Sequence, residues 1–487
     1  MKLNEVLYGI EVIKTNVSPD VEIKGITENT KKIKEGFIFT AIKGAKFDAN
    51  TFIKNALEMK AVCIVTDTEP EENVPYVLVK DTRKTLSLML CNFYSRPHES
   101  FKICVGITGT NGKTSTSVML KKIFEEAGMK VGLIGTMKYL IGDEEYNSET
   151  NSNHLTTPDS ENFWSLVALM REKGVEALVM EVSSHSLELN KISGMHFNVG
   201  VFTNLTRDHL DFHKDFDNYK KAKAKLFEMS DIAIINDDDS YGEDMKMLSK
   251  CPVKTYSIDR NSSDFVAKNT NYKGPDGVEY ELLFDETLFR VKVNIPGTFT
   301  VYNSLAAASA ALTVGIGYDK IISGLLATKR IDGRIDKIDI DAPFSVIIDF
   351  AHTPDAMENV LKTVRGFAPK RIITVFGCGG DRDKTKRPIM GKLATEMSEY
   401  VIITSDNSRS EDKLMILNDI VAGIDENKKN YELIPDREVA IKRAMDICEE
   451  EDIVMLLGKG HEEYEIDAEG KHPFSERKIV TDYFNER

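Results

Sequence analysis

A glycine-rich hexapeptide that ends in lysine and threonine is the segment of this sequence best suited to chemistry. It consists of Gly109, Thr110, Asn111, Gly112, Lys113 and Thr114, between an apolar run and a stretch with helical spacing. Glycines let backbone N–H groups approach phosphate oxygens, and a helix N-terminus adds partial positive charge. Lys113 can neutralise the terminal phosphates, and the Thr114 hydroxyl can bind Mg²⁺. Ile107 replaces the first glycine of the strict phosphate-loop pattern, yet the strand–turn–helix context predicts ATP binding.

Two further candidate side chains follow predicted strands of the same region. Glu181 ends a strand predicted at 177–182, and His209 follows one at 199–204. Ligands of parallel α/β sheets bind at the carboxyl ends of the strands, so both residues belong at the edge that carries Thr114. Together the three form an oxygen-rich set suited to Mg²⁺. Taken alone, Glu181 is equally explained as a loop cap and His209 as a hydrogen-bonded polar residue. The four-residue spacing of His209 and His213 lacks an HExxH pattern, which argues against zinc.

A parallel sheet covered by helices is needed to position these residues, and the hydrophobic pattern predicts it. Apolar runs alternate with helical stretches, which is typical of α/β proteins. The predicted strands are 61–66, 76–79, 103–108, 177–182, 199–204, 232–236, 346–350, 372–376, 400–405 and 453–457. Helices are predicted at 113–128 and 302–328, and an antiparallel insertion at 253–296. We therefore expect three domains: a mixed α/β domain at 1–98, a central parallel-sheet domain at 99–331 and a Rossmann-like domain at 332–487.

The bulk composition excludes several classes of function. The 63 Lys and Arg residues against 78 Asp and Glu residues give a net charge of −15, which argues against nucleic acid or an anionic membrane as partner. Six cysteines stand singly, mostly in apolar runs, as expected for reduced thiols in the cytoplasm. No secretion signal and no apolar stretch of about 18 residues is present, so we expect a cytoplasmic protein without membrane insertion.

The hexapeptide and its preceding Thr108 resemble the signature of the Mur ligase superfamily, which includes folylpolyglutamate synthase. Further segments match this family in order and span essentially the whole chain. They are TTPDS (156–160), EVSSHSLELNK (181–191), TNLTRDHLDFH (203–213), YKKAKAKLF (219–227), YNSLAA (302–307), GR (333–334), DFAHTPD (349–355), GCGGDRDKTKRP (377–388) and GKGHE (458–462). The resemblance implies a UDP-binding N-terminal domain, a central ATPase domain and a C-terminal Rossmann-like domain.

The resemblance also implies the reaction and its cofactors. Family members use ATP and Mg²⁺ to turn a carboxylate into an acyl phosphate, which an amine then attacks. The matching catalytic residues are Lys113, Glu181, His209 and Lys223, and the matching metal ligands are Thr114, Glu181, His209 and Lys223. Lys223 aligns with a lysine that is carbamylated in the family, although a solvated basic helix face is the ordinary reading of KKAKAK. The residues that match ATP contacts outside the hexapeptide are Asn303, Arg334, Asp349 and His352.

For a UDP-muramyl peptide substrate, the matching residues are Thr30, Thr156, Thr157, Ser183 and Lys191. The family carries Asp-Ser-Arg where this sequence has Asn29, Thr30 and Lys31. Thr30 keeps a hydroxyl, but Lys31 lacks the bidentate contact that arginine makes. Lys191 likewise replaces a usual arginine, and Leu189 replaces a common glutamine.

The acceptor amino acid is suggested by Asp406-Asn407-Ser408-Arg409, which resembles the Asp-Asn-Pro-Arg motif of the family members that add meso-diaminopimelate. Arg409 and Arg382 can bind a carboxylate through their guanidinium groups, and Asn407 and Glu462 can bind the neighbouring ammonium. Asp406 and Gly458 complete the expected acceptor set.

Several alternatives remain at this point. L-lysine or another diamino acid, such as lanthionine, is the nearest alternative acceptor. A folylpolyglutamate-synthase-like ligase would share the phosphate loop but leave the N-terminal region unused. A non-catalytic ATP-binding regulatory protein on a Mur scaffold would bind substrates without turnover. We expect a monomer that uses UDP-N-acetylmuramoyl-dipeptide and meso-diaminopimelate as small-molecule substrates.

Overall fold

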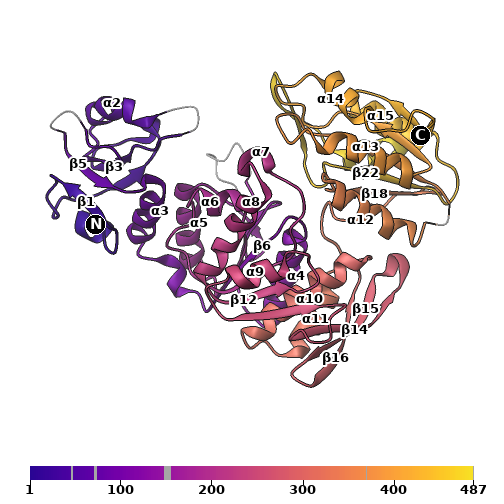
Figure 1. The fold of residues 1–487 in the computed structure, drawn as a ribbon, viewed down its shortest axis with the longest axis horizontal. Helices are drawn as coiled ribbons and strands as arrows, with labels where there is room; N and C mark the ends of the chain where they lie inside the picture. The colour runs from indigo at the N-terminus through magenta and orange to yellow at the C-terminus, as the bar shows by residue number, and fades with distance from the viewer. Residues whose placement is uncertain (45–47, 71–73, 147–154, 369, 486–487) are drawn as a thin grey trace.

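Three α/β parts follow one another along the chain, each built on its own main sheet (Figure 1). The computed structural model describes residues 1–44, 48–70, 74–146, 155–368 and 370–485. The main sheets have five, eleven and six strands in chain order, which confirms the predicted fold class. The domain boundaries stay predictions, and each main sheet falls inside one of the predicted ranges 1–98, 99–331 and 332–487.

The N-terminal sheet has the order β1-β5-β4-β3-β2 and is parallel except where β1 pairs with β5. The predicted strands 61–66 and 76–79 are confirmed as β4 and β5. The other three strands, β1, β2 and β3, were not predicted from the sequence. The elements are α1 (Leu3–Val6), β1 (Val12–Thr15), β2 (Gly25–Thr27), η1 (Thr30–Lys32), β3 (Phe37–Thr40), η2 (Ala49–Phe52), α2 (Ile53–Glu58), β4 (Cys63–Thr66), β5 (Tyr76–Val79), α3 (Thr82–Phe93) and η3 (Pro97–Ser100).

The central sheet contains a parallel core in the order β12-β11-β6-β10-β7. Its strands are β6 (Ile103–Thr108), β7 (Val131–Ile134), β8 (Tyr139–Ile141), β9 (Glu144–Glu145), β10 (Ala177–Glu181), β11 (Phe197–Phe202), β12 (Ser230–Asn236), β13 (Val253–Ser257), β14 (Phe265–Tyr272), β15 (Val278–Phe284) and β16 (Thr287–Val293). Every residue of β6 and β10 is buried, because helices cover both faces. This burial explains why both strands read as continuous apolar runs.

Helices of the central part include α4, which follows the phosphate loop directly. The helices are α4 (Lys113–Glu126), α5 (Ser160–Glu172), α6 (Ser184–Glu188), α7 (Leu210–His213), α8 (Phe216–Ala224), η4 (Lys225–Met229), α9 (Gly242–Leu248), η5 (Gly274–Asp276), α10 (Thr298–Thr313) and α11 (Tyr318–Ala327). The helices predicted over 302–328 are confirmed as α10 and α11, which separate near Gly315. The predicted insertion at 253–296 is antiparallel only from β14 to β16, since β13 joins the parallel run beside β12.

The C-terminal sheet has the order β17-β18-β22-β19-β20-β21, with only its edge strand β17 antiparallel. The predicted strands here are confirmed as β18, β19, β20 and β22. The elements are β17 (Asp336–Ile338), β18 (Ser345–Asp349), α12 (Pro354–Arg365), β19 (Ile372–Phe376), α13 (Lys386–Met397), β20 (Tyr400–Ile403), α14 (Lys413–Val421), β21 (Tyr431–Leu433), α15 (Arg437–Asp446), β22 (Ile453–Leu457), β23 (Tyr464–Asp467), β24 (Gly470–Pro473) and α16 (Glu476–Asn485). None of the helices within the described ranges is long and apolar enough to cross a membrane.

The N-terminal and central parts share one hydrophobic core. A single cluster of buried side chains runs from Leu3 on α1 through Met89 on α3 to Trp164 on α5. The Trp164 indole N–H donates to the Ser87 hydroxyl at 2.9 Å, and that hydroxyl donates to the Lys191 carbonyl at 3.0 Å. Burial of this size is typical of a permanent interface, so these two parts behave as one unit.

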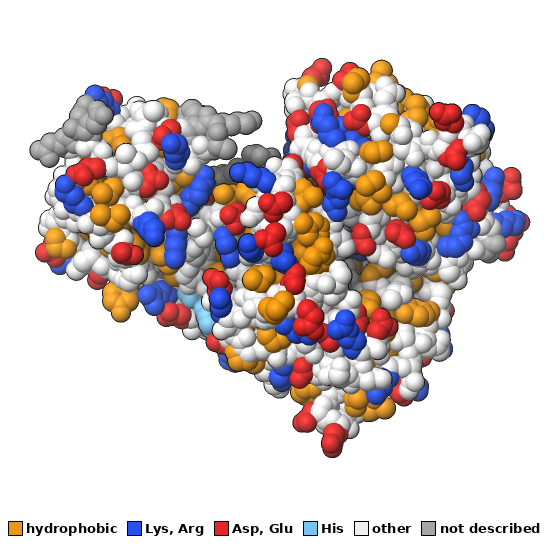
Figure 2. Space-filling view, in the orientation of Figure 1, with side chains coloured by type: hydrophobic (Ala, Val, Ile, Leu, Met, Phe, Trp, Pro, Cys, Tyr) orange, Lys and Arg blue, Asp and Glu red, His pale blue; other side chains and the backbone are white. Residues whose placement is uncertain are grey.

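The central and C-terminal parts, by contrast, have separate cores and meet through polar groups. The two clusters of the C-terminal part contain only residues from 335 onward. Asn111 donates its side-chain N–H to Asp355 of α12 at 2.9 Å, and Arg207 lies 3.6 Å from the Asp383 carboxylate. Figure 2 shows the surface hollowed between the N-terminal and C-terminal parts, with Lys and Arg side chains on both flanks.

We expect Trp164→Ala to lower the free energy of unfolding by about 3–5 kcal/mol, because it leaves a cavity in the core that the first two parts share. Trp164 is fully buried and is the only tryptophan in the chain, so the variant has no tryptophan fluorescence. Urea unfolding is therefore followed by far-UV circular dichroism. Tyr272→Ala, at a half-exposed position, is the matched control and should change the unfolding midpoint little. Equal midpoints for the two variants would contradict the shared core.

Candidate active site

The phosphate loop approaches neighbouring side chains so closely that glycine is required at two positions. Gly109 and Gly112 have φ values of +152° and +85°. A Cβ at Gly109 would lie 1.9 Å from the Thr203 hydroxyl oxygen, and one at Gly112 would lie 2.4 Å from the Asn303 amide oxygen. The loop is therefore held against the end of β11 on one side and α10 on the other.

Backbone groups of the loop are held by Asn204, which follows β11. The Thr110 N–H donates to the Asn204 carbonyl at 2.9 Å, and the Asn111 N–H donates to the Asn204 side-chain oxygen at 2.8 Å. The Lys113 ammonium folds back and donates to the carbonyls of Gly109 and Thr110, each at 2.9 Å. Burial lowers the pKa of Lys113, and Glu181 and Asp208 oppose this shift.

Glu181 lies at the carboxyl end of β10, beside the loop as predicted. Its side chain is 1% exposed and accepts hydrogen bonds from the Thr114 hydroxyl at 3.1 Å, the Thr136 hydroxyl at 2.8 Å and the Thr136 N–H at 3.0 Å. None of these donors carries a charge. A carboxylate whose hydrogen-bond partners are neutral donors is chemically suited to bind a cation such as Mg²⁺.

His209 stands one residue after a buried aspartate that sequence reasoning missed. The Asp208 carboxylate lies 3.3 Å from the His209 ring and 3.8 Å from the His352 ring of the C-terminal part. Burial lowers the pKa of His209 to about 3, so its ring is neutral and keeps a lone pair for a ligand. Burial raises the pKa of Asp208, but His209 and His352 outweigh it, and the net pKa is well below the usual value.

Lys223 lies on α8 and is only 2% exposed. Its nitrogen lies 4.5 Å from the centre of the Tyr219 ring, and the Tyr219 hydroxyl lies 3.1 Å from the Thr110 hydroxyl in the phosphate loop. Burial lowers the pKa of Lys223 far below its ordinary value, and the positive charge of Lys113 acts in the same direction. The structure therefore places Lys223 close to the loop, in surroundings that disfavour its protonated form.

Asp349 and Arg334 lie together at the start of the C-terminal part. The Asp349 carboxylate accepts from the Ile335 N–H at 2.7 Å and the Ala351 N–H at 2.8 Å, while burial raises its pKa and Arg334 opposes the shift. The Arg334 guanidinium lies 4.9 Å from the centre of the Phe350 ring, and its buried Nε has no hydrogen-bond acceptor among the described residues. His352 is hydrogen-bonded to the Phe350 carbonyl at 3.0 Å. A guanidinium with an unused donor beside the phosphate loop is suited to an anion.

The acceptor loops 406–409 and 458–462 meet at the carboxyl end of the C-terminal sheet. The Asn407 amide donates to the Glu462 carboxylate at 2.8 Å. A Cβ at Gly458 would lie 2.7 Å from the Asp406 carboxylate, which explains the glycine.

Two guanidinium groups lie close together beside these loops. The Arg409 guanidinium donates to the Gly380 carbonyl at 2.8 Å, and the Arg382 guanidinium donates to the Asp381 carbonyl at 3.1 Å. Burial lowers the pKa of Arg409, and the neighbouring charge of Arg382 lowers it further. Two converging guanidinium groups next to a carboxylate–amide pair match the two charged ends of an amino acid.

Comparison with known proteins decides the family. Residues 107–311 match the Mur ligase middle domain, and residues 333–460 match the Mur ligase, glutamate ligase domain. Two curated relatives named UDP-N-acetylmuramoyl-L-alanyl-D-glutamate–2,6-diaminopimelate ligase are 40% identical over 491 residues (Clostridioides difficile) and 43% identical over 493 residues (Clostridium perfringens), each covering 99% of both chains. The chain belongs to the Mur ligase family.

Solved structures agree with this assignment. A structure titled as the same 2,6-diaminopimelate ligase covers 100% of this Mur ligase and 99% of its own chain, with a TM-score of 0.70 and 28% identity. A Mycobacterium tuberculosis folylpolyglutamate synthase covers 77% of this chain and 92% of its own, with a TM-score of 0.64 and 16% identity, which shows a shared fold alone.

The predicted Mg²⁺ ligands fit a metal ion in their chemistry. Thr114 and Glu181 are in direct contact, the His209 ring is neutral, and burial lowers the pKa of Lys223 close to the loop. The part of the chain that the structure describes contains no cluster of three or more His, Cys, Asp or Glu side chains arranged for a metal. A site made from one hydroxyl, one carboxylate and one imidazole suits Mg²⁺, which keeps several of its ligands as water or phosphate.

The residues expected to contact the UDP-muramyl peptide lie in two parts of the Mur ligase, the N-terminal part and the central part. Thr157 donates to the Glu181 carbonyl at 3.0 Å and accepts from the Ser183 N–H at 3.1 Å, and the Thr156 hydroxyl lies 3.0 Å from that of Thr136. Thr156, Thr157 and Ser183 therefore hold the chain around Glu181 through hydrogen bonds.

Thr30 and Lys191 lie across the junction of the first two parts. Thr30 begins η1, where the Asn29 side chain accepts from the Lys31 N–H at 3.0 Å. Burial lowers the pKa of Lys191, and Asp159 and Glu28 oppose the shift, so Lys191 lies near acidic groups of both parts. The structure places Thr30 in the N-terminal part, without a direct contact to Lys191 of the central part.

Three polar residues of this Mur ligase escaped sequence reasoning: the partly exposed Thr136 and the buried Asp208 and Lys459. Each lies within the site, and the matched segments TNLTRDHLDFH and GKGHE contain the last two. Thr136 had no such signal, because it follows the short strand β7 in an ordinary context.

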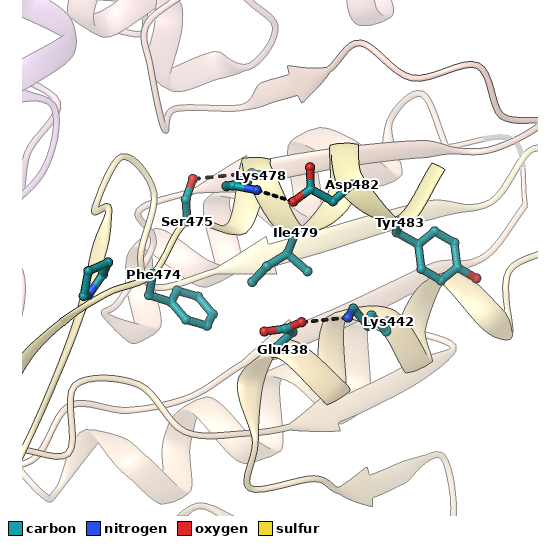
Figure 3. A pocket seen from close by; sticks show the side chains of 9 residues that line it. Glu438, Lys442, Phe474, Ser475, Lys478, Ile479, Asp482 and Tyr483 are labelled. Carbon is teal, nitrogen blue, oxygen red and sulfur yellow. Dashed lines mark hydrogen bonds and ion pairs between the residues drawn. The ribbon is translucent and has the colours of Figure 1, made fainter. Parts of the chain in front are cut away.

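A separate cavity of about 270 Å³ lies between α15 and α16, away from all predicted site residues (Figure 3). Its lysines are paired within their own helices, Lys442 with Glu438 at 2.6 Å and Lys478 with Asp482. It adds nothing to the ligase site.

We expect Thr136→Val to raise the Mg²⁺ concentration for half-maximal activity by about tenfold, because it removes the hydroxyl that donates to Glu181 at 2.8 Å while the backbone N–H bond remains. Thr136→Ser keeps the hydroxyl and should behave like the wild type. Unchanged Mg²⁺ dependence in Thr136→Val would show that Glu181 is oriented by other groups.

Proposed function

We propose that this Mur ligase joins the D-glutamate γ-carboxylate of UDP-N-acetylmuramoyl-L-alanyl-D-glutamate to an amino group of meso-diaminopimelate, and converts ATP to ADP and phosphate. Relatives that match nearly its whole length carry the name of that ligase. The observation that carries the proposal is the position of Arg382 and Arg409 beside the Asn407–Glu462 pair. This arrangement matches an acceptor that carries a second ammonium group and a second carboxylate at its far end.

The acceptor loops distinguish a diamino diacid from a simple diamine. The guanidinium groups of Arg382 and Arg409 bind the distal carboxylate, and the Glu462 carboxylate binds the adjacent ammonium. Burial raises the pKa of Glu462, and Asp406 adds to this shift. L-lysine lacks the distal carboxylate and would leave two guanidinium groups without an anion, which is costly in a partly buried site.

Activation of the γ-carboxylate takes place at the phosphate loop. A carboxylate oxygen attacks the γ-phosphorus of ATP, the bond to the β-phosphate oxygen breaks, and ADP leaves. Lys113 and Arg334 lie where charge develops on the transferred group, and the loop N–H groups position its oxygens. Mg²⁺ held by Thr114, Glu181 and His209 would offset the remaining phosphate charge.

Amide formation follows at the acyl phosphate. The acceptor amine attacks the carbonyl carbon, the amine loses a proton, and the C–O bond to phosphate breaks. The acceptor loops belong to the C-terminal part and the phosphate loop to the central part, so the reaction needs the polar interface between them to close. Closure also excludes water, which would otherwise hydrolyse the acyl phosphate.

Lys223 is proposed to be the carbamylated residue. Only an unprotonated amine reacts with CO₂, forming an N–C bond and releasing a proton, and burial lowers the pKa of Lys223 and so favours the unprotonated amine. The product is an anion with two oxygens close to the phosphate loop. Because a proton competes with CO₂ for the same nitrogen, lowering the pH removes the carbamate.

The acceptor assignment is tested by phosphate release from ATP in the presence of the UDP-muramyl dipeptide. We expect turnover with meso-diaminopimelate and not with L-lysine. Arg409→Ala should raise the KM for meso-diaminopimelate by about 100-fold, since loss of one partner from a desolvated charge pair costs about 2–5 kcal/mol. Arg290→Ala, on an exposed strand far from the loops, is the control. Preference for L-lysine would overturn the assignment of the acceptor but not the assignment of the protein as a ligase.

The state of Lys223 is tested by intact mass and by chemical rescue. We expect the native protein to carry the mass of one CO₂, which is lost on acidification. Lys223→Ala should lose activity and regain part of it with formate or acetate, whose carboxylates replace the carbamate. Lys221→Ala removes an exposed lysine of the same helix and should keep full activity. Full activity of Lys223→Ala without added carboxylate would contradict the proposal.

A further inference from the structure

Lys459 is a fully buried lysine between the two acceptor loops, and the proposed reaction assigns it no task. Its side chain is 0% exposed. The ammonium donates to the Asn407 side-chain oxygen at 3.1 Å and to the Tyr464 carbonyl at 2.9 Å, and it lies 5.3 Å from the centre of the Phe474 ring. A buried lysine is rare unless it is paired, so these contacts call for a reason.

The hydrogen bond from Lys459 fixes which way the Asn407 amide faces. The Asn407 oxygen accepts from the Lys459 ammonium and from the Ile466 N–H at 2.9 Å, so its N–H₂ group must point to Glu462. An ammonium has donors only and cannot accept from the amide nitrogen, so the opposite orientation is excluded. The Glu462 carboxylate is thereby held in place with lone pairs left for the acceptor.

The charge of Lys459 also balances two buried carboxylates. The ammonium lies 3.8 Å from Asp406 and 3.9 Å from Glu462. Two carboxylates that share a desolvated site do not both stay ionised without a cation. Asp406 also faces the Arg437 guanidinium, and Glu462 faces His352, Arg409 and the Tyr464 hydroxyl. Lys459 is the ammonium that lies within 4 Å of both carboxylates, so its removal should raise the pKa of Glu462.

We infer that Lys459 is a positioning residue for the acceptor: it orients Asn407 and keeps Glu462 ionised from beneath the loops, out of reach of the substrate. This inference rests on the proposed function, because it assigns the role toward the ammonium of meso-diaminopimelate. It predicts an effect on acceptor binding alone, whereas a purely structural lysine would affect all substrates through stability.

The test compares Lys459→Gln with the wild type in the full ligase assay. Glutamine can still donate to Asn407 but has no charge. Without the ammonium the pKa of Glu462 rises, so at a given pH more Glu462 is neutral and the acceptor ammonium binds less well. At pH values below the pKa of Glu462 we expect the KM for meso-diaminopimelate to rise by about tenfold, the change that about one pKa unit produces. The rise should become smaller as the pH increases and Glu462 ionises in both proteins. The KM values for ATP and for the UDP-muramyl dipeptide should stay within about twofold of wild type, well below that change.

The pH dependence separates a positioning role from a structural one. In Lys459→Gln the fall in acceptor KM with rising pH should move to higher pH, and Lys459→Arg, which keeps the charge, should restore it. Lys413→Met is the matched control: Lys413 pairs at 3.2 Å with Glu465 on the neighbouring strand β23 and does not contact Asp406, Asn407 or Glu462. It should leave the profile unchanged.

Should Lys459→Gln fail to fold, the same comparison is made in the Asp406→Asn background, where one buried carboxylate is already removed. Adding Lys459→Gln to that variant should still move the KM profile to higher pH. If the KM profiles with and without Lys459→Gln coincide, the inference about Lys459 is overturned. The proposed function then still stands, provided that the wild type turns over with meso-diaminopimelate. Absence of wild-type turnover with meso-diaminopimelate would overturn both.

Discussion

The close packing of the phosphate loop against the end of β11 is the constraint on which the site depends. The Thr203 hydroxyl donates to the Asn111 carbonyl at 2.6 Å, and the Asn204 amide donates to the same carbonyl at 3.1 Å. The chain that leaves Asn204 carries Asp208 and His209, so the fit of the loop also sets where these two side chains stand. On the other side, Glu181 at the end of β10 is fixed to Thr114 at the start of α4. Small side-chain changes at this junction therefore act on the nucleotide site and the metal set together.

Buried charges recur in the site, and each is handled in a different physical way. Glu181 accepts hydrogen bonds from neutral donors, burial lowers the pKa of Lys223, and Lys459 lies beside two carboxylates. These three solutions separate the tasks of binding a cation, reacting with a neutral electrophile and orienting neighbouring groups. Such arrangements cost stability, and they persist because the surrounding sheets are fully buried and rigid.

The sequence predicted the parts of the fold that have strong periodicity. β6, β19 and β22 are buried on both faces, and their apolar runs identified them to the residue or nearly so. β1, β2 and β17 lie at sheet edges or are short, and their pairing partners are distant in sequence, so local pattern carried little information about them. The sequence placed β13 in the antiparallel unit, because its parallel pairing with β12 is recognisable only in the assembled sheet.

The candidate site followed a similar rule. Lys113, Glu181 and Asn407 belong to matched segments and lie where the sequence placed them. Thr136 has no local signature, since its importance comes only from the position of Glu181 in space. Lys459 stands in a matched segment, but its role depends on a carbonyl of β23 and an amide from another loop, which no spacing in the sequence reveals.

The two kinds of interface within the chain have a consequence for how such enzymes diversify. The N-terminal and central parts are fused by one apolar core, whereas the C-terminal part keeps its own cores and meets the rest through a few hydrogen bonds and ion pairs. The proposed acceptor loops therefore belong to a part that is held together by its own cores, although residues 458–462 pack against Gly333 and Phe350, next to Arg334 and His352. Substitutions in the loop 406–409 can change the acceptor while the apolar core that supports the phosphate loop stays intact, so acceptor choice can diversify at one end of an unchanged scaffold.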